Sequence, residues 1–165
     1  TAHRRENWGE PMKGIFAAVR EMIARNEDVN VIFPMHKNPL IRELATEGFR
    51  GIEDKVHLIE PLEYVDFANL MAKCYLIMTD SGGIQEEAPA LGKPVMVLRT
   101  ETERPEAIEA GTVKLAGINK DDIFNIANEL INDKEAYEKM AHAANPYGDG
   151  KACERIVNNI IEYFK

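Results

Sequence analysis

Short, largely apolar runs alternate along this chain with longer segments in which apolar residues recur every three or four positions. The runs predict strands at 29–33, 56–59, 75–78, 95–98 and 112–115. The periodic segments predict helices at 11–25, 40–47, 64–73, 84–91, 121–132, 134–143 and 151–163, with one helical turn at 107–110. Strands without a regular alternation of apolar and polar residues are typical of a parallel sheet that helices cover on both faces. The pattern therefore predicts an α/β domain of three layers with a mostly parallel sheet.

The composition agrees with one domain that has its own core. Of the 165 residues, 45% are apolar, which is enough for a core in a chain of this size. Asp and Glu number 28 against 20 Lys and Arg, for a formal net charge of −8. This balance disfavours nucleic acid and anionic membranes as main partners, although it leaves room for a local basic pocket. No apolar run approaches the roughly 18 residues of a membrane span, and no signal peptide is visible.

The cysteines and the start of the chain carry two further expectations. Cys74 and Cys153 each fall near a predicted buried face, and with so few cysteines we expect a reduced, cytoplasmic protein without disulfides. The four histidines lack the spacing of a metal site. The chain opens at Thr1 with no strand ahead of its first helix. Because a βα unit needs that strand, we expect the chain to begin inside a longer protein, at the end of a first strand.

The stretch 76–88 joins a predicted strand to a predicted helix through Asp80-Ser81-Gly82-Gly83. In such a unit, unpaired backbone N–H groups and the positive end of the helix dipole point at one spot, and glycines let a ligand approach the backbone closely. The turn is therefore a candidate site for a phosphate or a diphosphate. The plain alternative is an ordinary tight turn between strand and helix, in which the following Glu-Glu pair only balances the helix dipole.

Parallel sheets bind ligands outside the carboxyl ends of their strands. The predicted sheet places five loops at this edge, at 3–5, 34–39, 60–62, 81–83 and 99–106. Their His, Arg, Ser and Gly content favours a phosphate-containing ligand. His3-Arg4-Arg5 would neutralise or protonate a phosphate leaving group, or else form a solvated basic turn. His36 either contacts the ligand or caps its own loop. Glu87 either accepts hydrogen bonds from ribose hydroxyls or offsets the helix dipole.

Five strings of the sequence together resemble the C-terminal half of the bacterial non-hydrolysing UDP-N-acetylglucosamine 2-epimerases. They are Thr1-Ala-His-Arg-Arg-Glu-Asn-Trp-Gly9, Pro34-Met-His-Lys-Asn-Pro39, Thr79-Asp-Ser-Gly-Gly-Ile-Gln-Glu-Glu-Ala88, Thr102-Glu-Arg-Pro-Glu-Ala107 and Asn145-Pro-Tyr-Gly-Asp-Gly150. The strings occur in the family's order and extend over essentially the whole chain.

The resemblance implies a pair of Rossmann-like domains, as in the GT-B glycosyltransferases, with the substrate in the cleft between them. Residues 1–165 would then be the C-terminal, UDP-binding domain. The implied reaction interconverts UDP-GlcNAc and UDP-ManNAc. The sugar loses its C2 proton and UDP is eliminated to leave a 2-acetamidoglucal, and UDP adds back after C2 is reprotonated on the other face. No redox cofactor or metal is implied, and the full-length enzyme is expected to be a homodimer in cell-envelope polysaccharide biosynthesis.

The resemblance also implies roles for individual residues. His3 matches the family's functional histidine near the diphosphate, a candidate acid or stabiliser of the leaving group. Ser81 and Gly82, followed by Gly83, match the turn that binds the diphosphate. Glu87 matches the carboxylate that binds the ribose.

Two more residues, Arg4 and His36, match positions that contact a second, activating UDP-GlcNAc in the bacterial enzymes. The carboxylates that handle the C2 proton come from the family's N-terminal domain, so we expect this chain alone to be catalytically inactive. Three other interpretations stay open: the equivalent half of a UDP-sugar glycosyltransferase, a hydrolysing epimerase that releases free ManNAc, and a non-catalytic sensor of nucleotide sugars. The strings at 3–7 and 102–106 argue against the glycosyltransferase.

Overall fold

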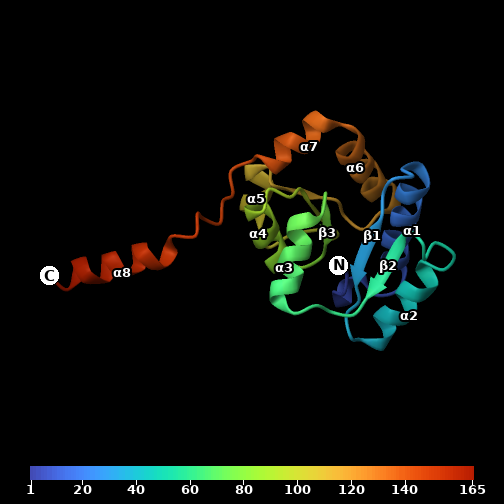
Figure 1. Cartoon of the computed structure of the whole chain (residues 1–165), viewed down its shortest axis with the longest axis horizontal. Coiled ribbons are helices and arrows are strands. Elements are labelled where there is room, and N and C mark those ends of the chain that lie inside the picture. Colours follow the sequence, from blue (N-terminus) through green and yellow to red (C-terminus); the bar gives the residue numbers. More distant parts are fainter.

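The computed structural model describes all residues, 1–165, and strands alternate with helices up to β5, after which three helices follow one another (Figure 1). Every predicted strand and helix is present, with ends that shift by one or two residues, and only η1 was not predicted. In chain order the elements are η1 (Arg5–Asn7), α1 (Glu10–Arg25), β1 (Val31–Pro34), α2 (Pro39–Gly48), β2 (Val56–Ile59), α3 (Tyr64–Lys73), β3 (Ile77–Thr79), α4 (Gly82–Ala90), β4 (Val95–Val97), α5 (Pro105–Ala110), β5 (Val113–Leu115), α6 (Lys120–Asn132), α7 (Lys134–Ala141) and α8 (Ala152–Tyr163).

All strand pairs are parallel, as predicted. The strands form two sheets: β1 pairs with β2 in one, and β4 lies between β3 and β5 in the other. The start of the chain lies beside β3, because the amino group of Thr1 donates to the Met78 carbonyl at 2.7 Å and the Asp80 N–H donates to the Thr1 carbonyl at 3.2 Å. These two bonds form the pattern of one parallel bridge. His3 therefore emerges at the carboxyl end of β3.

Helices cover both faces of the three-stranded sheet, which confirms the three-layer prediction. In β4, Val95 and Val97 belong to a cluster with side chains of α3, α4 and α5, whereas Met96 belongs to a larger cluster with α1, α2 and α6. Successive strand residues point to opposite faces, so both faces of β4 are buried. Figure 1 shows α3, α4 and α5 grouped on one side and α1 and α2 on the other.

Two residues determine the start of α2 and its packing on α1. The Asn38 side chain accepts from the Leu40 N–H at 3.0 Å and so caps the start of α2. At the other end of α2, a Cβ on Gly48 would lie 2.6 Å from Cδ2 of the Phe16 ring. α2 therefore packs this closely on α1 because residue 48 has no side chain.

The last helix, α8, extends away from the rest of the chain (Figure 1). The amphipathic pattern predicted this helix correctly. All of its residues are exposed, including Ile156 and Ile160, which are more than half exposed. The expectation that Cys153 lies near a buried face is wrong, because α8 packs against no other element. Cys74 is half-buried at the end of α3, and both cysteines are free thiols.

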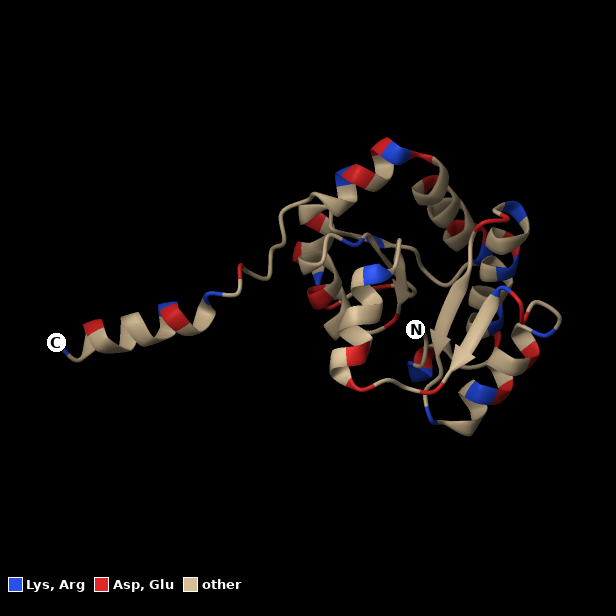
Figure 2. Ribbon diagram, in the orientation of Figure 1, with Lys and Arg blue, Asp and Glu red and all other residues tan.

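Charged side chains of both signs are mixed over the surface. Figure 2 shows Lys and Arg interspersed with Asp and Glu on the helices, rather than gathered on one face. None of the helices combines the length and apolarity that crossing a membrane requires. No group of three or more His, Cys, Asp or Glu side chains is arranged to hold a metal ion.

Candidate functional site

A cavity of about 320 Å³ opens at the carboxyl ends of β1 and β3. Its lining includes His3, His36, Pro61 and Ser81. These residues come from four of the five loops that the sequence predicts at this edge. The structure thus confirms that loops far apart in the sequence converge at one site, as expected for the carboxyl edge of a parallel sheet.

The floor of this site is the start of α4. The helix begins at Gly82, two residues earlier than predicted, so both glycines of the turn belong to its first turn. Ser81 occupies the N-cap position, and its side chain makes no capping hydrogen bond. The first backbone N–H groups of a helix have no partner within the helix, and no side chain caps this end. The helix start therefore offers N–H donors and a positive dipole to a ligand.

Two histidines stack at the side of the cavity. The rings of His3 and His36 lie 5.3 Å apart between centroids and are nearly parallel, with 7° between their planes. The His36 Nδ1 also accepts from the Asn38 N–H at 3.1 Å, so this histidine does cap its own loop. The loop cap and a ligand contact are compatible, because the ring still stacks on His3 at the site.

Burial lowers the pKa of His3 below its ordinary value of 6.5. The Asp80 carboxylate acts in the opposite direction, whereas His36, the Thr1 amino group and Arg4 lower the pKa further. The imidazole is therefore neutral at pH 7.5 in the free chain.

Charged residues next to η1 and in the loop after β4 flank the helix start. A methyl group on Gly82 would lie 3.9 Å from both Arg4 Nη2 and Glu103 Oε2, so these two side chains flank the turn. Glu103 is held by the nearly buried Arg99 at 2.7 Å, and Glu6 lies 3.0 Å from the same guanidinium. The hydrogen bond with Arg99 lowers the pKa of Glu103. Arg4 has no carboxylate partner within salt-bridge distance and remains available to an anion.

The loop after β4 is fastened to α4 by two further contacts. Thr102 Oγ1 donates to the amide oxygen of the fully buried Gln85 at 2.7 Å. Arg104 pairs with Glu86 on the same helix. The prediction that the loop at 99–106 belongs to this edge is confirmed.

The remaining predicted residue, Glu87, lies one helical turn into α4. A methyl group on Gly83 would lie 3.7 Å from Glu87 Oε1, so this carboxylate is at the same end of the helix. It forms no hydrogen bond or ion pair within the chain and is partly exposed. The carboxylate is thus positioned to accept hydrogen bonds from the hydroxyl groups of a ligand bound at the turn.

Two polar residues of the site were missed by the sequence reasoning. Asp80, which directly follows β3, is fully buried and accepts from the side chain of Asn7 at 3.0 Å. Asn7 is 1% exposed and donates also to the Leu98 carbonyl at 3.0 Å. Asp80 was part of the turn, but its burial depends on donors more than 70 positions away in the sequence. An Asp directly after an apolar strand was the one local signal.

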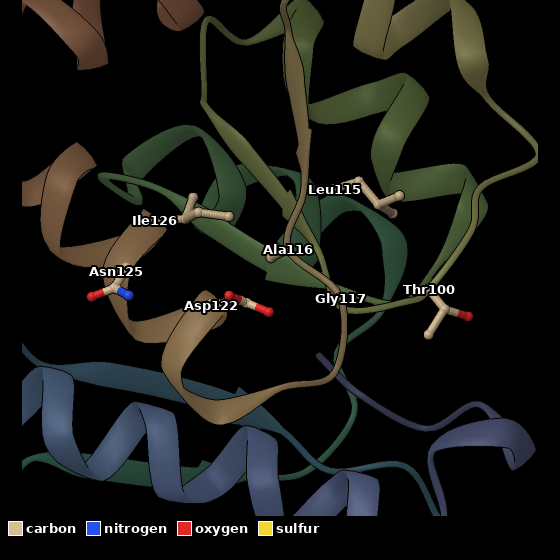
Figure 3. A pocket seen from close by; sticks show the side chains of 7 residues that line it. All are labelled: Thr100, Leu115, Ala116, Gly117, Asp122, Asn125 and Ile126. Carbon is tan, nitrogen blue, oxygen red and sulfur yellow. The ribbon is translucent and has the colours of Figure 1, made fainter.

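A second cavity, also of about 320 Å³, lies at the end of β5 against the start of α6. Figure 3 shows its lining, with Asp122 and Asn125 on α6 and Leu115 at the end of β5. The N–H groups at the start of α6 are already capped by the Asn119 side chain. A carboxylate in the lining and a capped helix make this cavity unfavourable for a phosphate, and none of the predicted site residues lines it.

The first site combines an uncapped helix start, an available guanidinium, a pair of stacked imidazoles and an unpaired carboxylate. The helix start and Arg4 favour a phosphate group, and Glu87 favours a neighbouring hydroxyl. This arrangement suits a nucleotide diphosphate with its ribose.

Known proteins resemble the chain over nearly its whole length. The family model described as UDP-N-acetylglucosamine 2-epimerase matches residues 1–161. A UDP-N-acetylglucosamine 2-epimerase of Bacillus subtilis is 56% identical over 164 residues, which are 99% of this chain and 43% of the relative. The chain thus spans less than half the length of this curated relative.

Solved structures with bound ligands also resemble the chain. The UDP-GlcNAc 2-epimerase of Neisseria meningitidis, bound to UDP-GlcNAc, superposes with a TM-score of 0.90 at 48% identity, over 98% of this chain and 43% of the other. The Methanocaldococcus jannaschii enzyme, in complex with UDP-GlcNAc and UDP, has a TM-score of 0.80 at 34% identity, over 98% and 44%. The predicted fold class is confirmed by these neighbours.

Proposed function

The chain belongs to the UDP-N-acetylglucosamine 2-epimerase family, and we propose that it is the C-terminal, UDP-binding domain of an enzyme that interconverts UDP-GlcNAc and UDP-ManNAc. The observation that carries this proposal is the uncapped start of α4 at a cavity lined by His3 and Ser81. In the proposal the diphosphate lies on Ser81 and Gly82, and the ribose hydroxyls donate to Glu87.

In the proposed reaction, negative charge develops on the diphosphate of the departing UDP, at the start of α4, which favours an anion. When the C2 proton leaves and the C1–O bond breaks, the electron pair of that bond goes to the departing UDP. Preorganised N–H donors and cations stabilise such developing charge. A bound diphosphate also raises the pKa of a nearby imidazole, so His3, neutral in the free chain, gains a proton as the ligand binds. The protonated ring then stabilises the leaving diphosphate.

In the proposal, another domain removes the C2 proton and returns it. The C2 proton is weakly acidic, so its removal needs a positioned base and its return needs an acid. The family's N-terminal domain supplies these carboxylates, and residues 1–165 alone are therefore expected to bind UDP without epimerising the sugar. We also propose that the full-length enzyme is a cytoplasmic homodimer in cell-envelope polysaccharide biosynthesis.

Arg4 and His36 are proposed to contact a second, activating UDP-GlcNAc. Arg4 flanks the turn at Gly82, and His36 stacks on His3. Each residue proposed for the second ligand thus adjoins one proposed for the first. A second ligand would therefore act on the diphosphate site through direct contacts rather than over a distance.

The test of the proposal is a calorimetric titration of UDP into this chain. The Ser81→Ala, Glu87→Ala double variant should lose at least tenfold in affinity, because each change removes a group from the proposed site. Glu109→Ala, which also removes an exposed carboxylate but lies on α5, is the matched control and should bind as the parent does. Equal affinity for all three would refute the placement of UDP. Turnover of UDP-GlcNAc by this chain alone would contradict the assignment of the base to another domain.

A further inference from the structure

The Asp80 side chain forms hydrogen bonds with several residues of the candidate site. Its Oδ2 atom accepts three hydrogen bonds, from the His3 N–H at 2.8 Å, the Arg4 N–H at 2.9 Å and the Asn7 side-chain amide at 3.0 Å. The residue is fully buried. One carboxylate oxygen thus fixes the backbone of the segment that carries His3.

The other carboxylate oxygen has a different situation. Asp80 Oδ1 is buried and forms no regular hydrogen bond. The nearest positively chargeable group is the imidazole of His3, whose Nδ1 lies 3.4 Å from Oδ1. Leaving a buried acceptor without a donor is unfavourable, and more so when the acceptor is charged. The state of the His3 ring in which Nδ1 carries a hydrogen that faces this oxygen is therefore the most stable one.

The hydrogen bond at one ring nitrogen of a histidine determines the state of the other. If Nδ1 carries the proton, Nε2 of the neutral ring carries a lone pair and is free to exchange a proton with a ligand. We propose that Asp80 is a positioning residue, which holds His3 in the Nδ1–H tautomer and so reserves Nε2 for the diphosphate oxygen. The exchange with the diphosphate rests on the proposed function, whereas the tautomer does not.

The surroundings of His3 make the neutral tautomer the relevant form. The Asp80 carboxylate and the stacked His36 lie against the ring, and the Thr1 amino group and the Arg4 guanidinium also act on its charge. Because the pKa of His3 is lowered by burial, the ring has one proton at pH 7.5, and its position on Nδ1 or Nε2 is a measurable property.

The experiment is nitrogen NMR of the chain labelled with ¹⁵N-histidine at pH 7.5, without ligand. The two ring nitrogens of His3, assigned by the loss of their signals in His3→Gln, report directly which one carries the proton. We expect the Nδ1–H form in the parent chain. Asp80→Asn keeps an oxygen that accepts from the three N–H donors, but it places an NH₂ group opposite His3 Nδ1. Because NH₂ is a donor, Nδ1 must then be unprotonated and accept its hydrogen. The variant should exchange the protonated and unprotonated signals and lower the pKa of His3 further.

Asp149→Asn is the matched control, because it removes an exposed carboxylate that pairs only with Arg155 and the Lys151 N–H. It should leave the His3 signals unchanged. An Nε2–H form in the parent chain refutes the proposal, and this result does not depend on whether Asp80→Asn folds. A folded Asp80→Asn variant that retains the parent tautomer refutes it as well.

The UDP titration separates this inference from the proposed function. A chain that binds UDP but holds His3 as Nε2–H overturns the role of Asp80 and leaves the function intact. A chain with the Nδ1–H form that does not bind UDP supports the role of Asp80 and counts against the function.

Discussion

Replacing Gly82 by alanine should separate ligand binding from folding. Gly82 is the first residue of α4, and its φ angle is not among the positive values that only glycine adopts readily. The added methyl group would lie 3.9 Å from Arg4 Nη2 and Glu103 Oε2, which is ordinary van der Waals contact. Alanine also favours helices over glycine by up to about 1 kcal/mol. The free energy of unfolding should therefore stay the same or rise by up to about 1 kcal/mol.

Ligand binding should respond in the opposite direction. The methyl group would fill the space between Arg4 and Glu103 in front of the helix start. A phosphate oxygen must come within about 2.9 Å of a backbone nitrogen to accept its hydrogen. A hydrogen bond to a charged group contributes about 1.5–3 kcal/mol, and each 1.4 kcal/mol corresponds to a factor of ten. Loss of one such bond predicts UDP binding that is about 10- to 150-fold weaker.

The two effects are measured by urea unfolding and by calorimetric titration of UDP. Gly14→Ala adds the same methyl group to α1, where it meets the Ile118 carbonyl rather than the turn, and should leave the affinity for UDP unchanged. If Gly82→Ala binds UDP as tightly as the parent chain, the diphosphate does not lie on the start of α4. If the variant loses more than about 2 kcal/mol of stability, the conformational argument for residue 82 is wrong.

Three further predictions concern stability, each read from urea unfolding. Asn7→Ala should destabilise by about 1–3 kcal/mol, because it leaves the Leu98 carbonyl and a buried carboxylate short of a donor; an unchanged midpoint would contradict the role of this side chain. Because His3 binds a proton less readily folded than unfolded, its contribution to stability is lost as pH falls below about 6.5, so His3→Gln should lose less stability between pH 7.5 and 5.5 than the parent. Gly48→Ala should cost about 1–3 kcal/mol by overpacking the buried Phe16 ring, and a neutral effect would show that α2 shifts freely on α1.

The elements of the fold and the loops that meet at the candidate site could be predicted from local patterns. Largely apolar strands specified a sheet buried on both faces, and the alternation of Val95 and Val97 with Met96 between two clusters confirms this. The Ser-Gly-Gly turn after β3 indicated an anion site, because strand, turn and helix are adjacent in the chain. Features of this kind depend on neighbours within a few positions, so the sequence records them directly.

Amphipathic spacing has a narrower meaning, as α8 demonstrates. The spacing of Ile156, Val157 and Ile160 predicted the helix correctly, but all three side chains are more than half exposed. Amphipathic spacing predicts a helix with one apolar face. Whether that face is buried depends on a second surface, and no element of this chain provides one. The expectation for Cys153 was wrong for the same reason.

The sequence by itself determined the α/β elements, the parallel sheet and the loops that gather at its carboxyl edge. Only the tertiary structure decided how Asp80 is used. Its burial is tolerable because donors from residues 3, 4 and 7 reach it across more than 70 positions. Likewise, His3 and His36 stack because the first segment and the loop after β1 meet at the sheet edge. Periodicity reports which faces are apolar, whereas the partner of a buried charge is set by contacts between distant segments, which exist only once the chain has folded.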